Sequence, residues 1–62
     1  MKTSELTKLM KKEGGCYLLE HRGEHDYWFC PLTGKTVPVP RHQSKEIPTG
    51  TANKILRDAG LK

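Results

Sequence analysis

The residue best suited to chemistry in this sequence is His25, which directly follows the turn-forming segment Arg22-Gly23-Glu24. Histidine is the side chain whose ordinary pKa, about 6.5, lets it accept and release protons near neutral pH. Cleavage of RNA is one reaction that such a histidine could catalyse, because RNA supplies its own nucleophile, the 2′-hydroxyl. Cleavage therefore needs only a base for that proton, an acid for the leaving oxygen and cations for the charge on phosphorus. A histidine presented just after a tight turn suits this role, although an exposed strand histidine without a function explains the same position.

Basic residues near this histidine are candidates for binding RNA phosphate. Arg22 is expected directly across a hairpin from His25, and we regard it as the first candidate. Lys35, Arg41 and Lys54 are further candidates, since phosphate contacts hold a nucleic acid without reading its sequence. Each of these three side chains is explained equally well by an ordinary charged surface.

One aromatic residue is a candidate for contact with RNA bases. Tyr27 lies two residues after His25 and shares its strand face, so it could stack on an unpaired base. Trp28 falls on the other face, and a chain this small needs its ring for the core. The segment Thr49-Gly50-Thr51 could bind a phosphate through the free N–H groups of a helix start, but ordinary capping is the simpler explanation.

Two cysteines and two histidines are nearly symmetric about the turn: Cys16, His21, His25 and Cys30. Zinc needs four ligands that converge on one point. Strand alternation sends His21 and His25 to opposite faces, so we expect no metal site and no cofactor. We expect the two cysteines to be small core residues. His42 follows the third expected strand and could approach the site, but a solvated surface position explains it as well.

The 62 residues are interpreted as one domain, residues 1–62. A domain of this size buries only about 60% of the surface of its unfolded chain, so we expect either a shallow site on the surface or a partner chain that adds stability. Eleven Lys or Arg residues against seven Asp or Glu residues give a net charge of +4, which favours a polyanion or an acidic protein partner. There is no apolar segment typical of a signal peptide or a membrane span. With two cysteines and no CxxC pair, we expect a cytoplasmic protein that does not contact membranes.

The apolar spacing predicts one helix near each end of the chain. The first covers about residues 4–13, with Thr3 or Ser4 as its cap and Gly14-Gly15 ending it. The second begins with Thr49 or Thr51 as its cap and ends at Gly60, after which Leu61 can fold back over the core. The apolar stripes are Leu6, Leu9 and Met10 in the first helix, and Ala52, Ile55, Leu56 and Ala59 in the second.

Between the helices the sequence changes to strand character, with a turn in the middle. A two-residue loop of Gly23-Glu24, with glycine first, predicts a type II′ hairpin in which Arg22 faces His25. A loop at Arg22-Gly23 would shift the register by one residue, and the sequence leaves that alternative open. The preferred register pairs Glu20 with Tyr27, Leu18 with Phe29, Leu19 with Trp28 and Tyr17 with Cys30.

A third strand is predicted from Thr36 to Pro40. Val37 and Val39 share one face, and Pro38 and Pro40 share the other. Because proline has no N–H to donate, we expect an edge strand, or one whose donors point outward. The element order α-β-β-β-α predicts an α+β fold, with a three-stranded antiparallel sheet and two helices on one face.

The order and spacing of several short segments resemble the HicA (YcfA-like) family of bacterial toxins over nearly the full length. These segments are Ser4-Glu5-Leu6, Gly15, Arg22-Gly23-Glu24-His25, Val37-Pro38-Val39-Pro40-Arg41-His42, Ile47-Pro48-Thr49-Gly50-Thr51 and Ile55-Leu56-Arg57-Asp58-Ala59-Gly60-Leu61.

The resemblance implies a fold like that of double-stranded-RNA-binding domains and the activity of a ribosome-independent mRNA interferase, an endoribonuclease. It also implies a HicB-type antitoxin that covers the site. The family's catalytic histidine follows a Gly-x turn, which corresponds to His25. This chain departs from the family at Glu24, where members often carry Ser or Asn. An acid beside the histidine could favour its protonated form or repel RNA phosphate, which bears on rate and pH profile.

Two other functions fit the same residues. The first is a non-catalytic RNA-binding module that uses the same sheet and basic side chains. It would bind RNA in a salt-sensitive way that His25 hardly affects, without cleavage. The second is a small protein-interaction domain, which would show neither property. Cleavage that depends on His25 distinguishes the nuclease from both.

Overall fold

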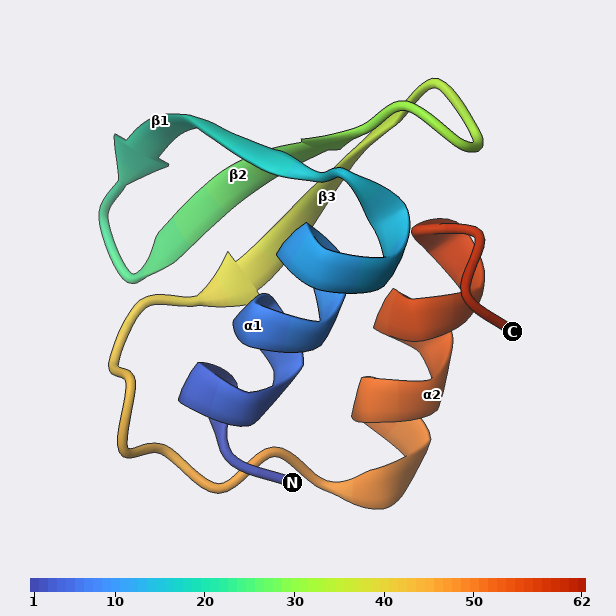
Figure 1. Cartoon of the computed structure of the whole chain (residues 1–62). Helices are drawn as coiled ribbons and strands as arrows, with labels where there is room; N and C mark the ends of the chain where they lie inside the picture. Colours follow the sequence, from blue (N-terminus) through green and yellow to red (C-terminus); the bar gives the residue numbers. More distant parts are fainter.

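A computed structural model describes all 62 residues and contains the five predicted elements in the predicted order. The sheet order is β1-β2-β3, antiparallel throughout, and both helices pack on one face of it (Figure 1). The predicted α+β class is therefore confirmed. The elements are α1 (Thr3–Gly14), β1 (Tyr17–Arg22), β2 (His25–Cys30), β3 (Lys35–Pro40) and α2 (Thr49–Asp58).

The β1–β2 hairpin has the predicted loop. β1 ends at Arg22 and β2 begins at His25, which leaves Gly23-Glu24 as the two-residue connection. Gly23 has a φ of 55°, and the φ of Glu24 is not positive. A type II′ turn requires this combination, with positive φ at its first central residue only. Arg22 pairs with His25 as predicted. His25 is therefore the first residue after the turn, opposite an arginine.

The register predicted for the far half of the hairpin is wrong. Glu20 pairs with Tyr27 as expected, but a β-bulge between Leu18 and Glu20 shifts everything beyond it. A bulge sets two residues on one strand against one on its partner, so Leu19 becomes the extra residue. The observed partners are Leu18 with Trp28 and Tyr17 with Phe29, in place of the predicted Leu18–Phe29, Leu19–Trp28 and Tyr17–Cys30.

β3 is an edge strand, as its prolines predicted. Val37 and Val39 are buried in the core, opposite Trp28 and Asp26. Pro38 and Pro40 lie opposite Tyr27 and His25, on the alternate positions. Since the backbone N–H of Arg41 donates to the Glu24 carbonyl (3.0 Å), the backbone N–H groups of the odd-numbered residues in β3 point toward β2. The positions that lack an N–H therefore face the outer edge of β3.

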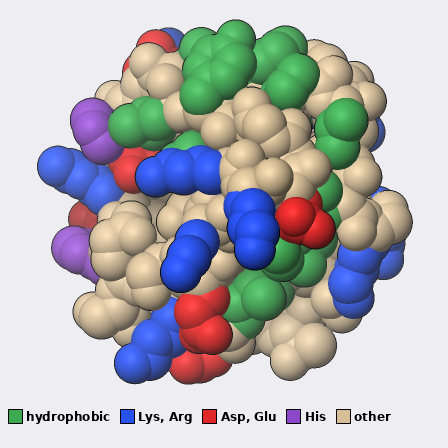
Figure 2. Space-filling view, in the orientation of Figure 1, with side chains coloured by type: hydrophobic (Ala, Val, Ile, Leu, Met, Phe, Trp, Pro, Cys, Tyr) green, Lys and Arg blue, Asp and Glu red, His purple; other side chains and the backbone are tan.

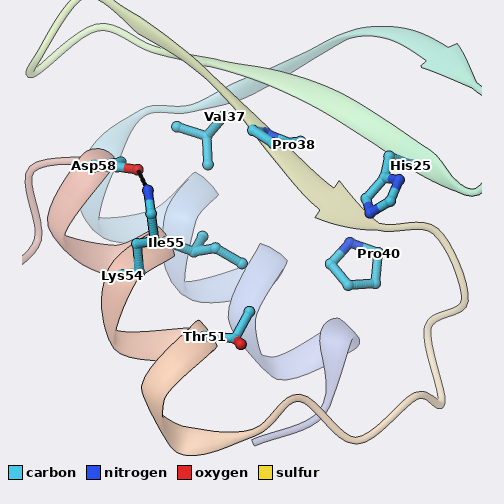
Figure 3. A pocket seen from close by; sticks show the side chains of 8 residues that line it. All are labelled: His25, Val37, Pro38, Pro40, Thr51, Lys54, Ile55 and Asp58. Atoms are coloured by element: carbon cyan, nitrogen blue, oxygen red, sulfur yellow. Dashed lines mark hydrogen bonds and ion pairs between the residues drawn. The ribbon is translucent and has the colours of Figure 1, made fainter.

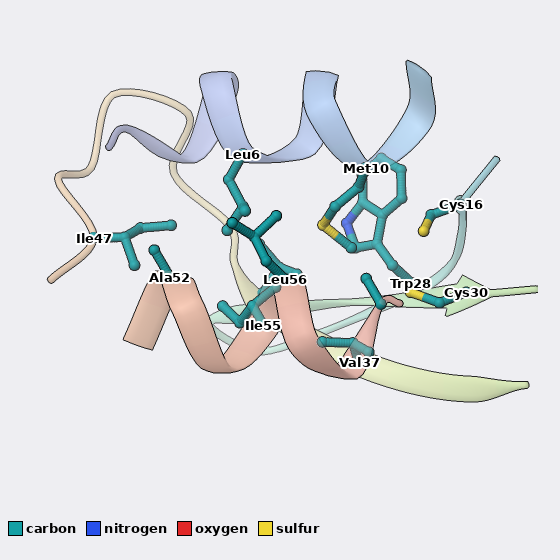
Figure 4. Packing of buried hydrophobic residues seen from close by; sticks show 12 residues of the cluster. Leu6, Met10, Cys16, Trp28, Cys30, Val37, Ile47, Ala52, Ile55 and Leu56 are labelled. Atoms are coloured by element: carbon teal, nitrogen blue, oxygen red, sulfur yellow. The ribbon is translucent and has the colours of Figure 1, made fainter. Parts of the chain in front are cut away.

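A single apolar core fills the space between the sheet and the two helices (Figure 4). Trp28 is 5% exposed and spans the region beneath α1. Cys16 and Cys30 are both buried free thiols, as expected for core residues. Leu61 packs against the same cluster after the chain reverses at Gly60. The twelve buried members are Leu6, Met10, Cys16, Trp28, Cys30, Val37, Val39, Ile47, Ala52, Ile55, Leu56 and Ala59.

The predicted side-chain caps are absent from both helices. At α1, the Thr3 N–H donates to the Lys45 carbonyl (2.9 Å) and the Ser4 N–H to the Gln43 carbonyl (3.0 Å). The connection between β3 and α2 thus satisfies N–H groups that a cap would otherwise bind. α2 begins at Thr49 after Pro48, with no side-chain cap. Neither helix is long and apolar enough to cross a membrane.

Candidate active site

His25 lies at one end of a groove between the outer edge of β3 and α2, which we name the β3–α2 groove (Figure 3). The groove has a volume of about 250 Å³. Its apolar lining comes from two buried core residues and two prolines, and its polar lining from His25 and three residues of α2. The lining residues are His25, Val37, Pro38, Pro40, Thr51, Lys54, Ile55 and Asp58.

The imidazole of His25 is available to a substrate. His25 is exposed, and its ring forms no hydrogen bond or ion pair with any other residue of the chain. In Figure 3 the ring lies beside Pro40, its cross-strand partner, at the mouth of the groove. Because the turn at Gly23-Glu24 fixes the start of β2, this position follows directly from the hairpin. The geometry suits a group that exchanges protons with a bound molecule.

Three of the predicted RNA-binding residues gather around His25. Arg22 lies opposite it, with its guanidinium 5.8 Å from the centre of the Tyr27 ring and its Nε 2.6 Å from the Glu20 carboxylate. Tyr27 is half-buried on the same face of β2 as His25. Arg41 lies against the turn, where its Nη1 donates to the Gly23 carbonyl (3.4 Å).

The other two predicted RNA-binding residues lie at the far end of the groove, around Asp58. Lys54 donates to the Asp58 carboxylate at 2.9 Å, and the Lys35 ammonium lies 4.0 Å from it. The hydrogen bond from Lys54 holds the pKa of Asp58 below its usual range, and the charge of Lys35 acts in the same direction. Asp58 is therefore ionised at neutral pH. Sequence reasoning passed over it, although the Lys54–Asp58 spacing of four residues on a helix indicated the pair.

The other two histidines pair with carboxylates. The Nδ1 atom of His21 contacts the carboxylate of Asp26, a nearly buried residue on the helix-facing side of the sheet. His21 and His25 are thus on opposite faces, as predicted. His42 comes near the site, with its Nε2 3.7 Å from the Glu24 carboxylate. No group of three or more His, Cys, Asp or Glu side chains converges in a way that could hold a metal ion.

The surface charge is mixed. Figure 2 shows Lys and Arg side chains spread over the face seen in Figure 1, with acidic side chains between them. No uninterrupted basic surface covers this face. The net charge of +4 therefore acts as a general attraction for polyanions, and specific contacts depend on individual side chains such as those at the groove.

Comparisons with known proteins agree on one family. A family model described as the HicA toxin of bacterial toxin–antitoxin systems matches residues 3–61. A protein of Photorhabdus laumondii named probable mRNA interferase HicA 2 is 36% identical over 62 residues, which is the whole of both chains. No solved structure matches the chain.

Proposed function

The chain belongs to the HicA family of bacterial toxins, and on that premise we propose that it is an mRNA interferase, an endoribonuclease with His25 as its general acid or base. The observation that carries this proposal is the position of His25. An exposed imidazole without a protein partner lies at the mouth of a groove that also holds Lys54. The name of the Photorhabdus relative supports mRNA as the substrate.

The chemistry needs only the chain, the RNA and solvent water. As a base, His25 takes the proton from a ribose 2′-hydroxyl, and the 2′-oxygen attacks the adjacent phosphorus. The bond from phosphorus to the 5′-oxygen breaks, and the leaving oxygen takes a proton from water. This leaves a 2′,3′-cyclic phosphate and a 5′-hydroxyl. As an acid, the protonated imidazole instead gives its proton to the leaving oxygen, and water takes the proton of the 2′-hydroxyl.

Cations near His25 stabilise the charge that develops on the phosphate. Arg22 lies directly across the hairpin, and Arg41 lies against the same turn. Lys54 and Lys35 contact the bound RNA at the far end of the groove, and Tyr27 offers its ring to a base on the outer face of the sheet. Such contacts position the backbone and add electrostatic stabilisation of the transition state.

The wider proposal follows the family. Residues 1–62 form one toxin domain, which acts in the cytoplasm without a metal ion. A HicB-type antitoxin neutralises it by covering His25 and the groove. Because the chain carries a net charge of +4, an acidic antitoxin surface would complement it.

The test is cleavage of purified RNA in the presence of a metal chelator by the wild type, His25→Ala and His42→Ala. Loss of the acid–base group is expected to slow cleavage about 10²- to 10⁴-fold. His42→Ala is the matched control, since it removes a nearby exposed histidine that does not line the groove. Cleavage by His25→Ala at the wild-type rate would refute the assignment. Salt-sensitive binding without cleavage by any form would favour the RNA-binding module.

A further inference from the structure

We propose that the β3–α2 groove is a subsite for one unpaired nucleobase of the RNA, and that Lys54 and Asp58 read the edge of that base. The bound nucleotide presents its own ribose to His25. The inference rests on the proposed function, because it takes His25 as the group that acts on the ribose. It adds the conformation of the substrate and a base preference, neither of which follows from the cleavage chemistry.

The size of the groove selects a single base. Its volume of about 250 Å³ lies below the roughly 300–1,000 Å³ of sites that enclose drug-sized ligands. One heterocycle fits such a space, while a stacked or paired base does not. A base inside an RNA duplex is held in the stack, so only an unpaired nucleotide can enter. The subsite thus separates this chain from proteins that recognise double-stranded RNA by its shape.

The walls of the groove suit the flat, weakly polar faces of a base. Val37 and Ile55 are core residues whose outer surfaces form the floor. The rings of Pro38 and Pro40 add rigid apolar surface along β3, as Figure 3 shows. Removing the faces of a base from water against these groups is favourable, and rigid side chains lose little conformational entropy on binding.

The polar end of the groove offers one acceptor and one donor side by side. The carboxylate of Asp58 and the ammonium of Lys54 are 2.9 Å apart, and both lie at the end of the groove away from His25 (Figure 3). Adenine, cytosine and guanine each carry an exocyclic amino group that can donate to the carboxylate, next to an acceptor for the ammonium. Uracil has only a ring N–H between two carbonyl oxygens: the ammonium can bind one of them, but the other stays unpaired beside the carboxylate and repels it. The pair therefore favours bases with an amino group over uracil.

The first test blocks the groove. Thr51 is an exposed residue that lines it from the first turn of α2, and Thr36 is an exposed threonine of β3 outside it. Thr51→Phe is expected to lose most of the cleavage of single-stranded RNA, while Thr36→Phe keeps the wild-type rate. Circular dichroism checks that both variants are folded. Equal cleavage by the two folded variants would overturn the subsite.

The second test reads the base preference. The substrates are 12-residue 2′-O-methyl RNAs with a single unmodified ribonucleotide, A, C, G or U, each used single-stranded and annealed to its complement. The wild type should cut the amino-bearing bases about tenfold or more faster than U, and single strands faster than duplexes. In Asp58→Asn the ratio of the cleavage rate at amino-bearing bases to that at U should fall toward one, since an amide both donates and accepts.

The outcomes separate the two proposals. If the wild type cuts no RNA, the proposed function fails. If it cuts total RNA through His25 but cuts the four oligonucleotides equally, cuts none of them, or cuts duplexes as fast as single strands, the nuclease stands and the base subsite is refuted. A preference that Asp58→Asn leaves unchanged would equally refute the assignment of the Lys54–Asp58 pair.

Discussion

Gly23→Ala tests whether the turn that presents His25 depends on a backbone conformation that only glycine adopts easily. Gly23 has a φ of 55°, and a Cβ added there would meet no atom within 4 Å. A loss of stability therefore comes from the backbone alone. For an L-residue the left-handed region costs about 1–2 kcal/mol. In a domain of this size each kcal/mol shifts the melting temperature by about 4–8 °C, so we expect a fall of about 5–15 °C.

Gly50→Ala is the matched control for that substitution. Gly50 lies in the first turn of α2, its φ is not positive, and its added Cβ also meets nothing within 4 Å. The same chemical change should here stabilise the protein by about 0.4–1 kcal/mol, because alanine has fewer conformations to lose on folding. The two variants are thus expected to shift the melting temperature in opposite directions.

Thermal denaturation followed by far-UV circular dichroism measures both shifts under the same conditions. A third form, made by chemical synthesis with D-alanine at position 23, should melt at or above the wild-type temperature, because positive φ suits a D-residue. If Gly23→Ala melts at the same temperature as the wild type, or if D-alanine destabilises as much as L-alanine, the turn does not depend on the positive φ of Gly23.

Two further predictions concern titrating groups. Burial, followed by the neighbouring Cys16 thiol, raises the pKa of Cys30 to about 12, so roughly one Cys30 in 10⁴ is a thiolate at pH 8. Mass spectrometry should therefore find iodoacetamide labelling of Cys30 in urea but not in the folded protein, and fast labelling of the folded protein would contradict this. The Met1 ammonium lies 2.5 Å from the Glu46 carboxylate and lowers the pKa of Glu46. The pair therefore stabilises the fold at pH values above the ordinary carboxyl pKa, and this stabilisation is lost as the pH falls through the lowered pKa. Glu46→Gln should accordingly be less stable than the wild type at pH 7 and equally stable at pH 2. High salt should reduce the difference at pH 7, because the pair is exposed. A difference in stability that persists at pH 2 would show that it does not come from the ion pair.

Local patterns were sufficient to predict the element order and the position of His25. Gly23 could occupy a positive-φ turn position, and Val37 and Val39 alternate with prolines, so the hairpin and the edge strand follow from residue types. The bulge at Leu19 could not be predicted in this way. Tyr17, Leu18 and Leu19 are three successive apolar residues, all exposed in the structure, and no alternation between faces fixes their register.

The candidate site was only partly predictable because the groove depends on packing between distant segments. His25 and Lys54 were both candidates, but their joint placement requires α2 to lie beside β3, and no local pattern encodes that distance. The helical spacing of four residues indicated that Asp58 pairs with Lys54, but its place at the groove and its contact with Lys35 depend on the same packing. The exchange of side-chain caps for the carbonyls of Gln43 and Lys45 is likewise a tertiary effect.

The prolines of β3 explain why the groove stays open at this edge of the sheet. An edge strand normally presents unpaired N–H groups that can pair with a strand of another chain. Pro38 and Pro40 occupy the outward-facing positions of β3, so those donors are missing and strand addition is disfavoured. The inward donors of Val37 and Val39 still bind β2, and their side chains still reach the core. The same alternation of valine and proline thus holds β3 in the sheet, blocks its outer edge, and lines the space beside His25 with rigid apolar rings.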